Sequence, residues 1–263
     1  PRTLALTLYG DLDVSVIAEL PCGRRPVMTR VVPPERGEDA ERFLVAQAKE
    51  GRQSFVVCPL IDDSEAVQAR AVISEHRRLQ ETTLAELRVG LLHGRMSVLE
   101  KHQAMEAFRN GEMDVLVATS VIEVGVDIPN ATVMLIQGAD RFGLAQLHQL
   151  RGCVGRSIHQ SYCLLLTDSV SEDVGNRLGV LVRSNDGFEI SEADLRMRGP
   201  GDFFGTRQSG LPPLRMARLS DRDILAVAKE EANQLLSEDP SLTRNQPLAA
   251  GVRRYTTRGV TEE

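Results

Sequence analysis

The sequence predicts an α/β protein whose core is a parallel sheet covered by helices on both faces. The main observation is that short apolar runs alternate with longer helical segments between residues 27 and 167, the pattern of a parallel sheet with crossover helices. A second is that runs such as Ser54–Leu60 are apolar at nearly every position, as strands buried on both faces are. A third is a helix start at Ser97, where Glu100 completes a capping box.

The expected elements follow these signals in chain order. Gly51 and Gly111 stand where two of the helices end. The expected strands are Val27–Val32, Ser54–Leu60, Leu87–Leu92, Val115–Ala118, Thr132–Ile136 and Cys163–Leu166, and the helices between them are Glu38–Glu50, Ser64–Gln80 and Ser97–Asn110.

After Thr167 the alternation gives way to helical segments alone. Two helices are expected over Ser171–Arg183 and Ser191–Met197, followed by a loop rich in Gly and Pro over Gly199–Pro213. The amphipathic segment Asp221–Leu236 is expected to be a helix that packs in a core, with docking of a partner as the alternative. From Ser241 no periodicity is readable, and we expect a loosely ordered tail over residues 241–263.

Composition excludes several classes of function. In 263 residues, 31 Lys and Arg stand against 37 Asp and Glu, so the net charge of −6 excludes a globally basic nucleic-acid binder but not a local basic face. No run approaches the roughly 20 apolar residues of a membrane span. The four cysteines form no C-x-x-C pair, which fits a reducing, cytoplasmic setting without a zinc or redox site. The chain starts at Pro1 without Met or a signal pattern, so we expect it to begin within a longer protein.

Polar and glycine-spaced residues gather directly after the predicted strands. Parallel α/β sheets bind ligands at the carboxyl ends of their strands. His93-Gly94-Arg95 follows one strand, Thr119 follows the next, and the segment Gln149–Arg156 comes after a third. In that segment, arginine offers a fork suited to phosphate, and glycine lets the backbone approach an anion closely. The alternative is a helix end with solvated arginines.

These residues resemble the second motor domain of superfamily-2 helicases. Thr119-x5-Gly125-x-Asp127-x-Pro129 is similar to motif V, and Gln149-x-x-Gly152-x-x-Gly155-Arg156 is similar to motif VI. More narrowly, roughly residues 1–240 resemble the C-terminal part of the RecG family of DNA branch-migration helicases. The matching text is PRTLALTLYGDLDVSVIAELPCGRRPV, VATSVIEVGVDIPNATVMLI, DRFGLAQLHQLRG and SNDGFEISEADLRMRGPGDFFGTRQSG. The nearest rival is the transcription-repair coupling translocase, which shares GLAQL and QLRG.

The resemblance implies a division of the chain into four parts. Residues 1–26 would end the first motor domain and form the linker, and 27–168 would be the second RecA-like domain. Residues 169–240 would hold a helical hairpin, a translocation loop and a further helix, and 241–263 the tail. The chain contains no G-x-x-x-x-G-K-[ST] and no D-E-x-H. The first motor domain with its ATP and Mg²⁺ ligands, and the wedge domain that splits a fork, are therefore expected upstream, and the isolated chain is expected to be inactive.

The same resemblance implies roles for individual residues. Arg156 would be the arginine finger that reaches the γ-phosphate of ATP, a contact worth roughly 10³–10⁵ in rate. Gln149, with Gly125, Asp127, Gly152, Cys153 and Gly155, would line the nucleotide cleft. Thr119 and His93-Gly94-Arg95 would face the DNA backbone, whose phosphates position a strand without reading its sequence. For His93 alone, a structural role is an equal alternative.

Cys153 is the main departure from the family pattern, which has arginine at this place in Q-L-R-G-R-V-G-R. A thiol cannot supply the charged fork that arginine offers to phosphate. A tolerated variant, a damaged allele and a non-hydrolysing homologue remain open. We expect ATP hydrolysis to be reduced about tenfold or more, because a charged hydrogen bond of about 1.5–3 kcal/mol is lost.

A local basic stretch supplies the second functional signal. Between Leu195 and Arg218, five arginines stand against the single acid Asp202. By resemblance this is the translocation motif, in which a helical hairpin and a loop couple ATP-driven closure to pulling on duplex DNA; a solvated loop is the alternative. The residues implied are Arg177, Arg196, Arg198, Thr206, Arg207 and Gln208.

The sequence thus predicts the C-terminal motor part of an ATP-dependent DNA helicase that remodels stalled forks and branch-migrates recombination intermediates. Its expected partners are branched or forked DNA, the missing N-terminal domains and a single-strand-binding protein, and the protein is expected to be a monomer away from membranes. The alternatives are the transcription-repair coupling translocase and a module that binds branched DNA without hydrolysing ATP.

Overall fold

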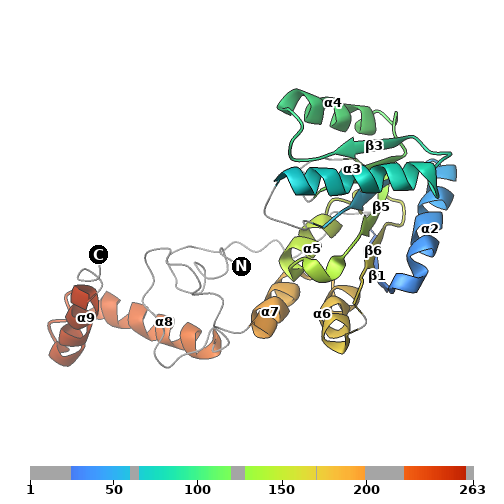
Figure 1. Cartoon of the computed structure of the whole chain (residues 1–263). Coiled ribbons are helices and arrows are strands. Elements are labelled where there is room, and N and C mark those ends of the chain that lie inside the picture. Colours follow the sequence, from blue (N-terminus) through green and yellow to red (C-terminus); the bar gives the residue numbers. More distant parts are fainter. Residues whose placement is uncertain (1–24, 60–64, 120–127, 170, 199–221, 259–263) are drawn as a thin grey trace. The chain divides into compact units, whose positions relative to one another are not determined.

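The structure, a computed structural model, describes residues 25–59, 65–119, 128–169, 171–198 and 222–258 (Figure 1). These residues fall into two compact units, one that ends at Met197 and contains the sheet, and one that contains the last two helices. Each unit is described by itself. The domain boundaries expected from the resemblance remain predictions.

The first unit is built on one parallel sheet of six strands, in the order β1-β6-β5-β2-β4-β3. Every neighbouring pair is parallel, so all carboxyl ends lie at the same edge of the sheet. The predicted α/β fold with a RecA-like parallel sheet is confirmed. The strands are β1 (Met28–Val32), β2 (Gln53–Val57), β3 (Val89–Leu92), β4 (Val115–Ala118), β5 (Ala131–Ile136) and β6 (Tyr162–Leu166).

Helices cover the sheet on both faces because alternate strand residues point to opposite sides. One core packs Phe55, Leu116 and Met134 against α4 (Val98–Arg109), α5 (Leu144–Arg151) and α6 (Glu172–Arg183). The other core packs the strand neighbours of those residues against α2 (Gly37–Lys49) and α3 (Glu65–Glu81). Both faces of the central strands are therefore buried, which explains their continuous apolar runs.

The predicted helix boundaries hold where the sequence carries a local signal. Ser97 and Glu100 form the predicted capping box at the start of α4, with reciprocal hydrogen bonds of 3.2 and 2.7 Å. Gly51 and Gly111 adopt the left-handed backbone of a helix end, with φ of 77° and 75°. Two short 3₁₀ helices, η1 (Pro34–Arg36) and η2 (Ala139–Arg141), were not predicted.

The second helix of the hairpin was predicted too short. The structure has α7 over Gly187–Arg198, four residues longer at its start than the expected Ser191–Met197. The Asp186 carboxylate accepts from the backbone N–H of Phe188 at 2.8 Å and so caps this helix. Ile190 in the added turn is fully buried, which gives the extra turn its packing.

The expectation of a loosely ordered tail over residues 241–263 was wrong. The second unit contains α8 (Arg222–Glu238) and then α9 (Gln246–Arg258), which begins after Ser241. Between them Asp239 accepts backbone hydrogen bonds from Thr243 at 2.9 Å and Arg244 at 2.6 Å, so a side-chain-capped turn separates the helices. Pro247 then stands in the first turn of α9, where a missing N–H carries no cost. In the part of the chain that is described, none of the helices has the length and apolar character needed to cross a bilayer.

Candidate functional site

Three polar residues lie at the carboxyl edge of the sheet, and the sequence predicted two of them, His93 and Thr119, as site residues. His93 follows β3, Thr119 follows β4 and Gln137 follows β5. Strands β3 and β4 are direct neighbours in register, with Leu92 opposite Ala118, and the Thr119 N–H donates to the Leu92 carbonyl at 3.2 Å. The parallel sheet therefore brings His93 and Thr119 side by side, at the strand ends where the sequence predicted that polar residues gather.

His93 and Thr119 carry buried polar atoms that find no hydrogen-bond partner among the described residues. These atoms are Nδ1 of His93 and Oγ1 of Thr119, whose residue is only 2% exposed. A buried polar atom without a partner costs about 1–3 kcal/mol. Parallel α/β sheets bind ligands at their carboxyl edge, and a ligand that reached these two atoms would remove this cost. We name His93, Gly94, Arg95 and Thr119 the strand-end region.

The exposed cation Arg95 makes the surroundings of His93 positive. Burial lowers the pKa of His93 below its ordinary value, and the nearby cation Arg95 lowers it further. Arg95 itself is exposed, and Gly94 is half-buried in the turn between β3 and α4. A neutral imidazole beside an exposed guanidinium can donate and accept hydrogen bonds without adding charge of its own.

The end of α5 and the segment after it hold those predicted nucleotide-cleft residues that the structure describes. Gln149 is exposed on α5, Gly152 is exposed at its end, and Arg156 is half-buried with its Nε donating to the Gly152 carbonyl at 3.2 Å. Gly155 has a φ of 80°, and a Cβ there would lie 2.6 Å from Val27. Only glycine fits this turn, which directly precedes Arg156.

Cys153 lies in the core and not on the surface beside Gln149. It is 5% exposed, and its thiol donates to the Gln149 carbonyl at 3.6 Å. Burial raises the pKa of this thiol, so it stays protonated and uncharged at neutral pH. Position 153 therefore presents neither a charge nor a donor fork to a nucleotide in this chain.

Arg151 and Arg177 tie the nucleotide-cleft segment to the helical hairpin. Arg151 is 3% exposed, and its Nη1 donates to the carbonyls of Leu181 at 2.8 Å and Ser184 at 2.9 Å, both at the end of α6. Its Nη2 lies 2.9 Å from Nδ1 of His148. We name Arg151 and Arg177 the arginine clamp.

Arg177 completes the clamp from the side of α6. Its guanidinium donates to the carbonyls of Phe142 at 2.8 Å and Asp140 at 2.5 Å, in the loop that precedes α5. The sequence singled out Arg177 for translocation, and the structure adds that its side chain contacts this loop. Arg151 was missed as a structural residue, and its one signal is its place beside Leu147 and Leu150 on a buried helix face.

Several predicted site residues are not characterised by the structure. Gly125, Asp127, Thr206, Arg207 and Gln208 lie outside the described residues. Arg196 and Arg198 lie on α7, and of these two residues only the backbone is described. Their assigned roles remain predictions.

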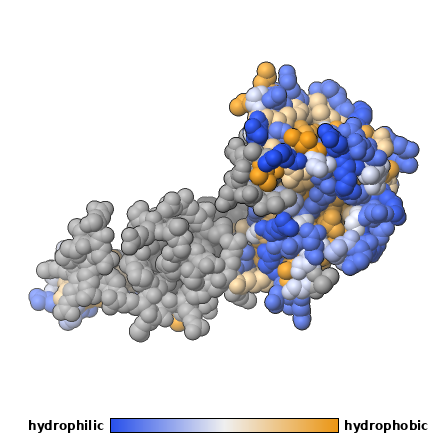
Figure 2. Space-filling view, viewed as in Figure 1, coloured by the Kyte–Doolittle hydropathy of each residue, from blue (hydrophilic) through white to orange (hydrophobic). Residues whose placement is uncertain are grey.

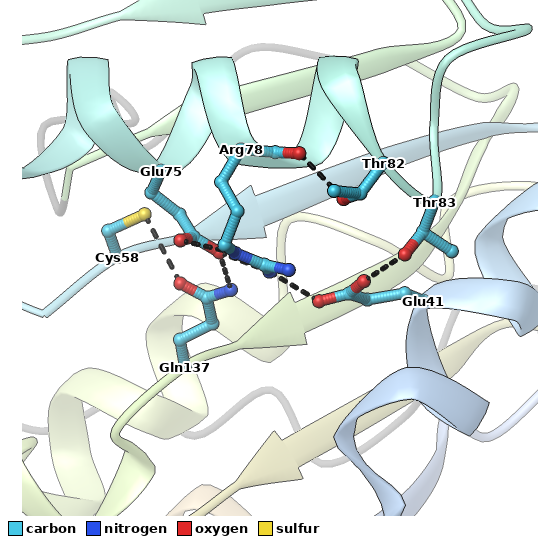
Figure 3. Close-up of polar contacts among 7 residues, drawn as sticks. All are labelled: Glu41, Cys58, Glu75, Arg78, Thr82, Thr83 and Gln137. Atoms are coloured by element: carbon cyan, nitrogen blue, oxygen red, sulfur yellow. Dashed lines mark hydrogen bonds and ion pairs between the residues drawn. The ribbon is translucent and has the colours of Figure 1, made fainter.

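A polar network across α2, α3 and the sheet edge was not predicted (Figure 3). Glu75 accepts from Arg78 at 2.7 Å and from Nε2 of Gln137 at 2.6 Å, while Oε1 of Gln137 accepts from the Cys58 thiol at 3.5 Å. Arg78 also donates to the buried Glu41 at 2.5 Å. Burial and the Glu75 charge raise the pKa of Cys58 to about 12. The network therefore fixes α2 and α3 to the carboxyl edge and contains no reactive thiol.

The described residues offer no group of three or more His, Cys, Asp and Glu side chains that could hold a metal ion. What they offer toward an anion is the guanidinium of Arg156, the amide of Gln149 and the strand-end region.

Comparison with known proteins gives two family matches along the chain. The model of the helicase conserved C-terminal domain matches residues 36–157. The model of domain 3, C-terminal, of the ATP-dependent DNA helicase RecG matches residues 184–250. The first match contains strands β2 to β5 and the segment after α5, and the second contains α7, α8 and the first residues of α9.

Individual relatives align over nearly the whole chain. An ATP-dependent DNA helicase RecG from Synechocystis sp. is 50% identical over 257 residues, which are 97% of this chain and 31% of that relative. The RecG of Bacillus subtilis is 43% identical over 96% of this chain and 38% of its own length. A solved structure of RecG bound to a three-way DNA junction is 41% identical with a TM-score of 0.67, over 87% of this chain and 29% of that one. The chain thus spans about a third of the curated relatives it matches.

Proposed function

We propose that this chain, which is homologous to the C-terminal part of the ATP-dependent DNA helicases named RecG, is the C-terminal motor part of such a helicase. The longer protein would use ATP to remodel stalled replication forks and to branch-migrate recombination intermediates. One observation carries the proposal: 97% of the chain aligns at 50% identity with a RecG helicase. The transcription-repair coupling translocase is not favoured, because the relatives and the matching domain model carry the RecG name.

In this proposal the nucleotide is ATP, bound between this sheet unit and an upstream motor domain. Arg156 would stabilise the charge that develops on the transferred phosphoryl group, and Gln149 would orient the nucleotide from the exposed face of α5. The glycine-only turn at Gly155, with φ of 80°, supports a fixed direction for Arg156. Mg²⁺ would neutralise phosphate charge, held by ligands of the upstream domain.

The strand-end region would bind the DNA backbone. Phosphate oxygens accept hydrogen bonds from hydroxyl and backbone groups and attract cations, so they suit Thr119, Gly94 and Arg95. The unpartnered Oγ1 of Thr119 and Nδ1 of His93 support this role, because a ligand there would remove a cost that the folded chain otherwise carries. The DNA partner would be branched or forked.

The arginine clamp would pass motion from the nucleotide cleft to the hairpin. Arg151 and Arg177 join α5 and its preceding loop to α6, so a shift of α5 on domain closure would move α6 with it. The hairpin would then lever the predicted translocation loop, with Arg196, Arg198, Thr206, Arg207 and Gln208, against duplex DNA.

The test uses a joined protein, in which this chain replaces the corresponding C-terminal region of the Synechocystis relative. We expect ATP hydrolysis that forked DNA stimulates, and Arg156→Ala should lower its maximal rate about 10³-fold. Arg42→Ala is the matched control, because Arg42 is an exposed arginine on α2 that pairs with Glu38. If Arg156→Ala and Arg42→Ala hydrolyse ATP equally fast, Arg156 is not the finger.

A second candidate function follows from the position of Cys153. Because its thiol is buried and uncharged, this chain lacks one cation of the family segment. A joined protein that binds forked DNA but does not hydrolyse ATP would favour a branched-DNA-binding module. In either case we propose a cytoplasmic monomer, and an isolated 263-residue chain that does not turn over ATP.

A further inference from the structure

Two adjacent aliphatic side chains at the start of α4 are turned into solvent. Val98 is 84% exposed and Leu99 is 67% exposed, and Val98 is the most exposed of the large apolar side chains in the described part of the chain. Apolar side chains show on the surface over α4 in Figure 2. Single exposed apolar residues are ordinary, whereas an adjacent pair beside a functional loop calls for a contact that covers it.

The packing of α4 does not require this pair. The helix buries Ala104 and Phe108 against the sheet, a stripe with the spacing of one helix face. Leu99 shares its side of the helix with exposed His102 and Gln103, away from that stripe. Substitution of Val98 and Leu99 by small polar residues should therefore leave the fold intact.

The surroundings of the pair are positive. Arg95 is exposed three residues before Val98, Lys101 follows in the next turn, and the first turn of a helix carries a partial positive charge. The one acid of that turn, Glu100, is directed back to the Ser97 N–H at 2.7 Å in the capping box. Arg95 and Lys101 outnumber the ionised Glu100, so on a chain of net charge −6 this small excess of positive charge favours a polyanion over an average protein partner.

The pair is also continuous with the strand-end region. Val98 begins α4, which follows β3 and His93-Gly94-Arg95 directly, and Thr119 ends the neighbouring strand. One short stretch thus combines groups suited to phosphate with an apolar pair. A nucleic-acid strand has the matching composition, because its charged phosphates alternate with the apolar faces of sugar and base.

We propose that Val98 and Leu99 form an apolar contact with the deoxyribose and base faces of the DNA strand whose phosphates lie against the strand-end region. This rests on the proposed function and adds to it the part of the strand that α4 contacts. The contact is insensitive to sequence, because every nucleotide offers a sugar and a base face. It also adds affinity that salt does not screen.

The test measures binding of labelled forked DNA by the joined protein between 50 and 200 mM salt, the range over which phosphate contacts lose roughly 10³–10⁵ in affinity. We expect the double substitution V98S/L99S to weaken binding about tenfold, or about 1.4 kcal/mol, at every salt concentration. Its plot of log affinity against log salt should keep the parent slope, because no charge is removed. Arg95→Gln should instead make that slope shallower by about 0.9.

The matched control is I224S/V227S, which removes two aliphatic side chains of similar exposure, 69% and 60%, from α8. If V98S/L99S and this control bind DNA equally well while Arg95→Gln weakens binding, the apolar contact is overturned. The proposed DNA-binding face would then still hold. If Arg95→Gln and Thr119→Val both kept the affinity and the salt slope of the parent protein, the strand-end region would not be the DNA-binding face. A fall in the Tm of the joined protein on V98S/L99S without DNA would show that a protein domain covers the pair, and would also overturn the contact.

Discussion

The arginine clamp and the strand-end region use buried polar groups in opposite ways. In the clamp, Arg151 and Arg177 donate to four backbone carbonyls at 2.5–2.9 Å. In the strand-end region, Thr119 Oγ1 and His93 Nδ1 are buried without a partner among the described residues. The comparison teaches that the clamp contributes to stability and holds elements in place, whereas the strand-end region leaves buried polar atoms unpartnered at a cost in stability.

The largest expected effect comes from breaking the clamp. Arg151→Met should lower the free energy of unfolding of the sheet unit by about 3 kcal/mol or more, because the carbonyls of Leu181 and Ser184 would be left buried without donors. Urea unfolding of the 263-residue chain measures this loss. Arg151→Lys keeps the charge but not the fork, so its loss should be intermediate. If Arg151→Met were as stable as the parent chain, the clamp would not contribute to stability, and the two regions would not differ in this respect.

An effect of the opposite sign is expected at the strand ends. Thr119→Val keeps the shape of the side chain and removes the unpartnered hydroxyl, so the free energy of unfolding should stay equal or rise by about 1 kcal/mol. The same substitution in the joined protein should weaken binding of forked DNA about tenfold, since a phosphate contact is lost. Thr132 is the matched control, because its Oγ1 is also buried and unpartnered but lies within β5.

Thr132→Val should therefore also preserve stability, and it should leave DNA affinity unchanged. A destabilised Thr119→Val, or an equal loss of DNA affinity in both variants, would contradict the view that Thr119 is kept for a ligand.

A smaller effect on the free energy of unfolding is expected from pH, through His148 beside the clamp. Burial, and then the charge of Arg151, lower the pKa of His148 below its ordinary value. The folded chain therefore holds His148 neutral while the unfolded chain takes up a proton near pH 6.5, so stability is present above that pH and is lost as pH falls through the lowered folded value. Urea unfolding at pH 7.5 and 5.5 should show this loss.

His148→Gln should make the pH dependence shallower, because an amide oxygen can accept from Arg151 without titrating. An unchanged pH dependence in this variant would mean that His148 is not held neutral by the clamp. The matched control is His76→Gln. The Nε2 atom of His76 lies 3.1 Å from the Val89 carbonyl, and this contact is not part of the clamp.

The sequence predicted those features that rest on local signals. The capping box at Ser97, the glycine turns at 51 and 111 and the apolar strands each depend on a few consecutive residues, so they are readable in one dimension. The parallel sheet also predicted that His93 and Thr119 lie at one edge, because the carboxyl ends of parallel strands share an edge, whereas the order that makes them neighbours came from the structure.

What the sequence could not predict depends on distant contacts. Arg151 reads as a phosphate-binding arginine until its neighbours Leu181 and Ser184, some thirty residues away, are known. The Cys58–Gln137–Glu75 network joins three segments with no common motif. Helix α9 was missed because its residues show no readable periodicity. A turn capped by Asp239 and then a proline separate it from α8.

The central claim is that this chain is the C-terminal motor part of an ATP-dependent helicase, and one comparison tests it most directly. Fork-stimulated ATP hydrolysis would be measured for the joined protein with Cys153 as it stands and with Cys153→Arg. We predict hydrolysis in both, about tenfold faster with arginine, since a charged hydrogen bond to the nucleotide is restored. Absence of fork-stimulated hydrolysis from both proteins would contradict the account.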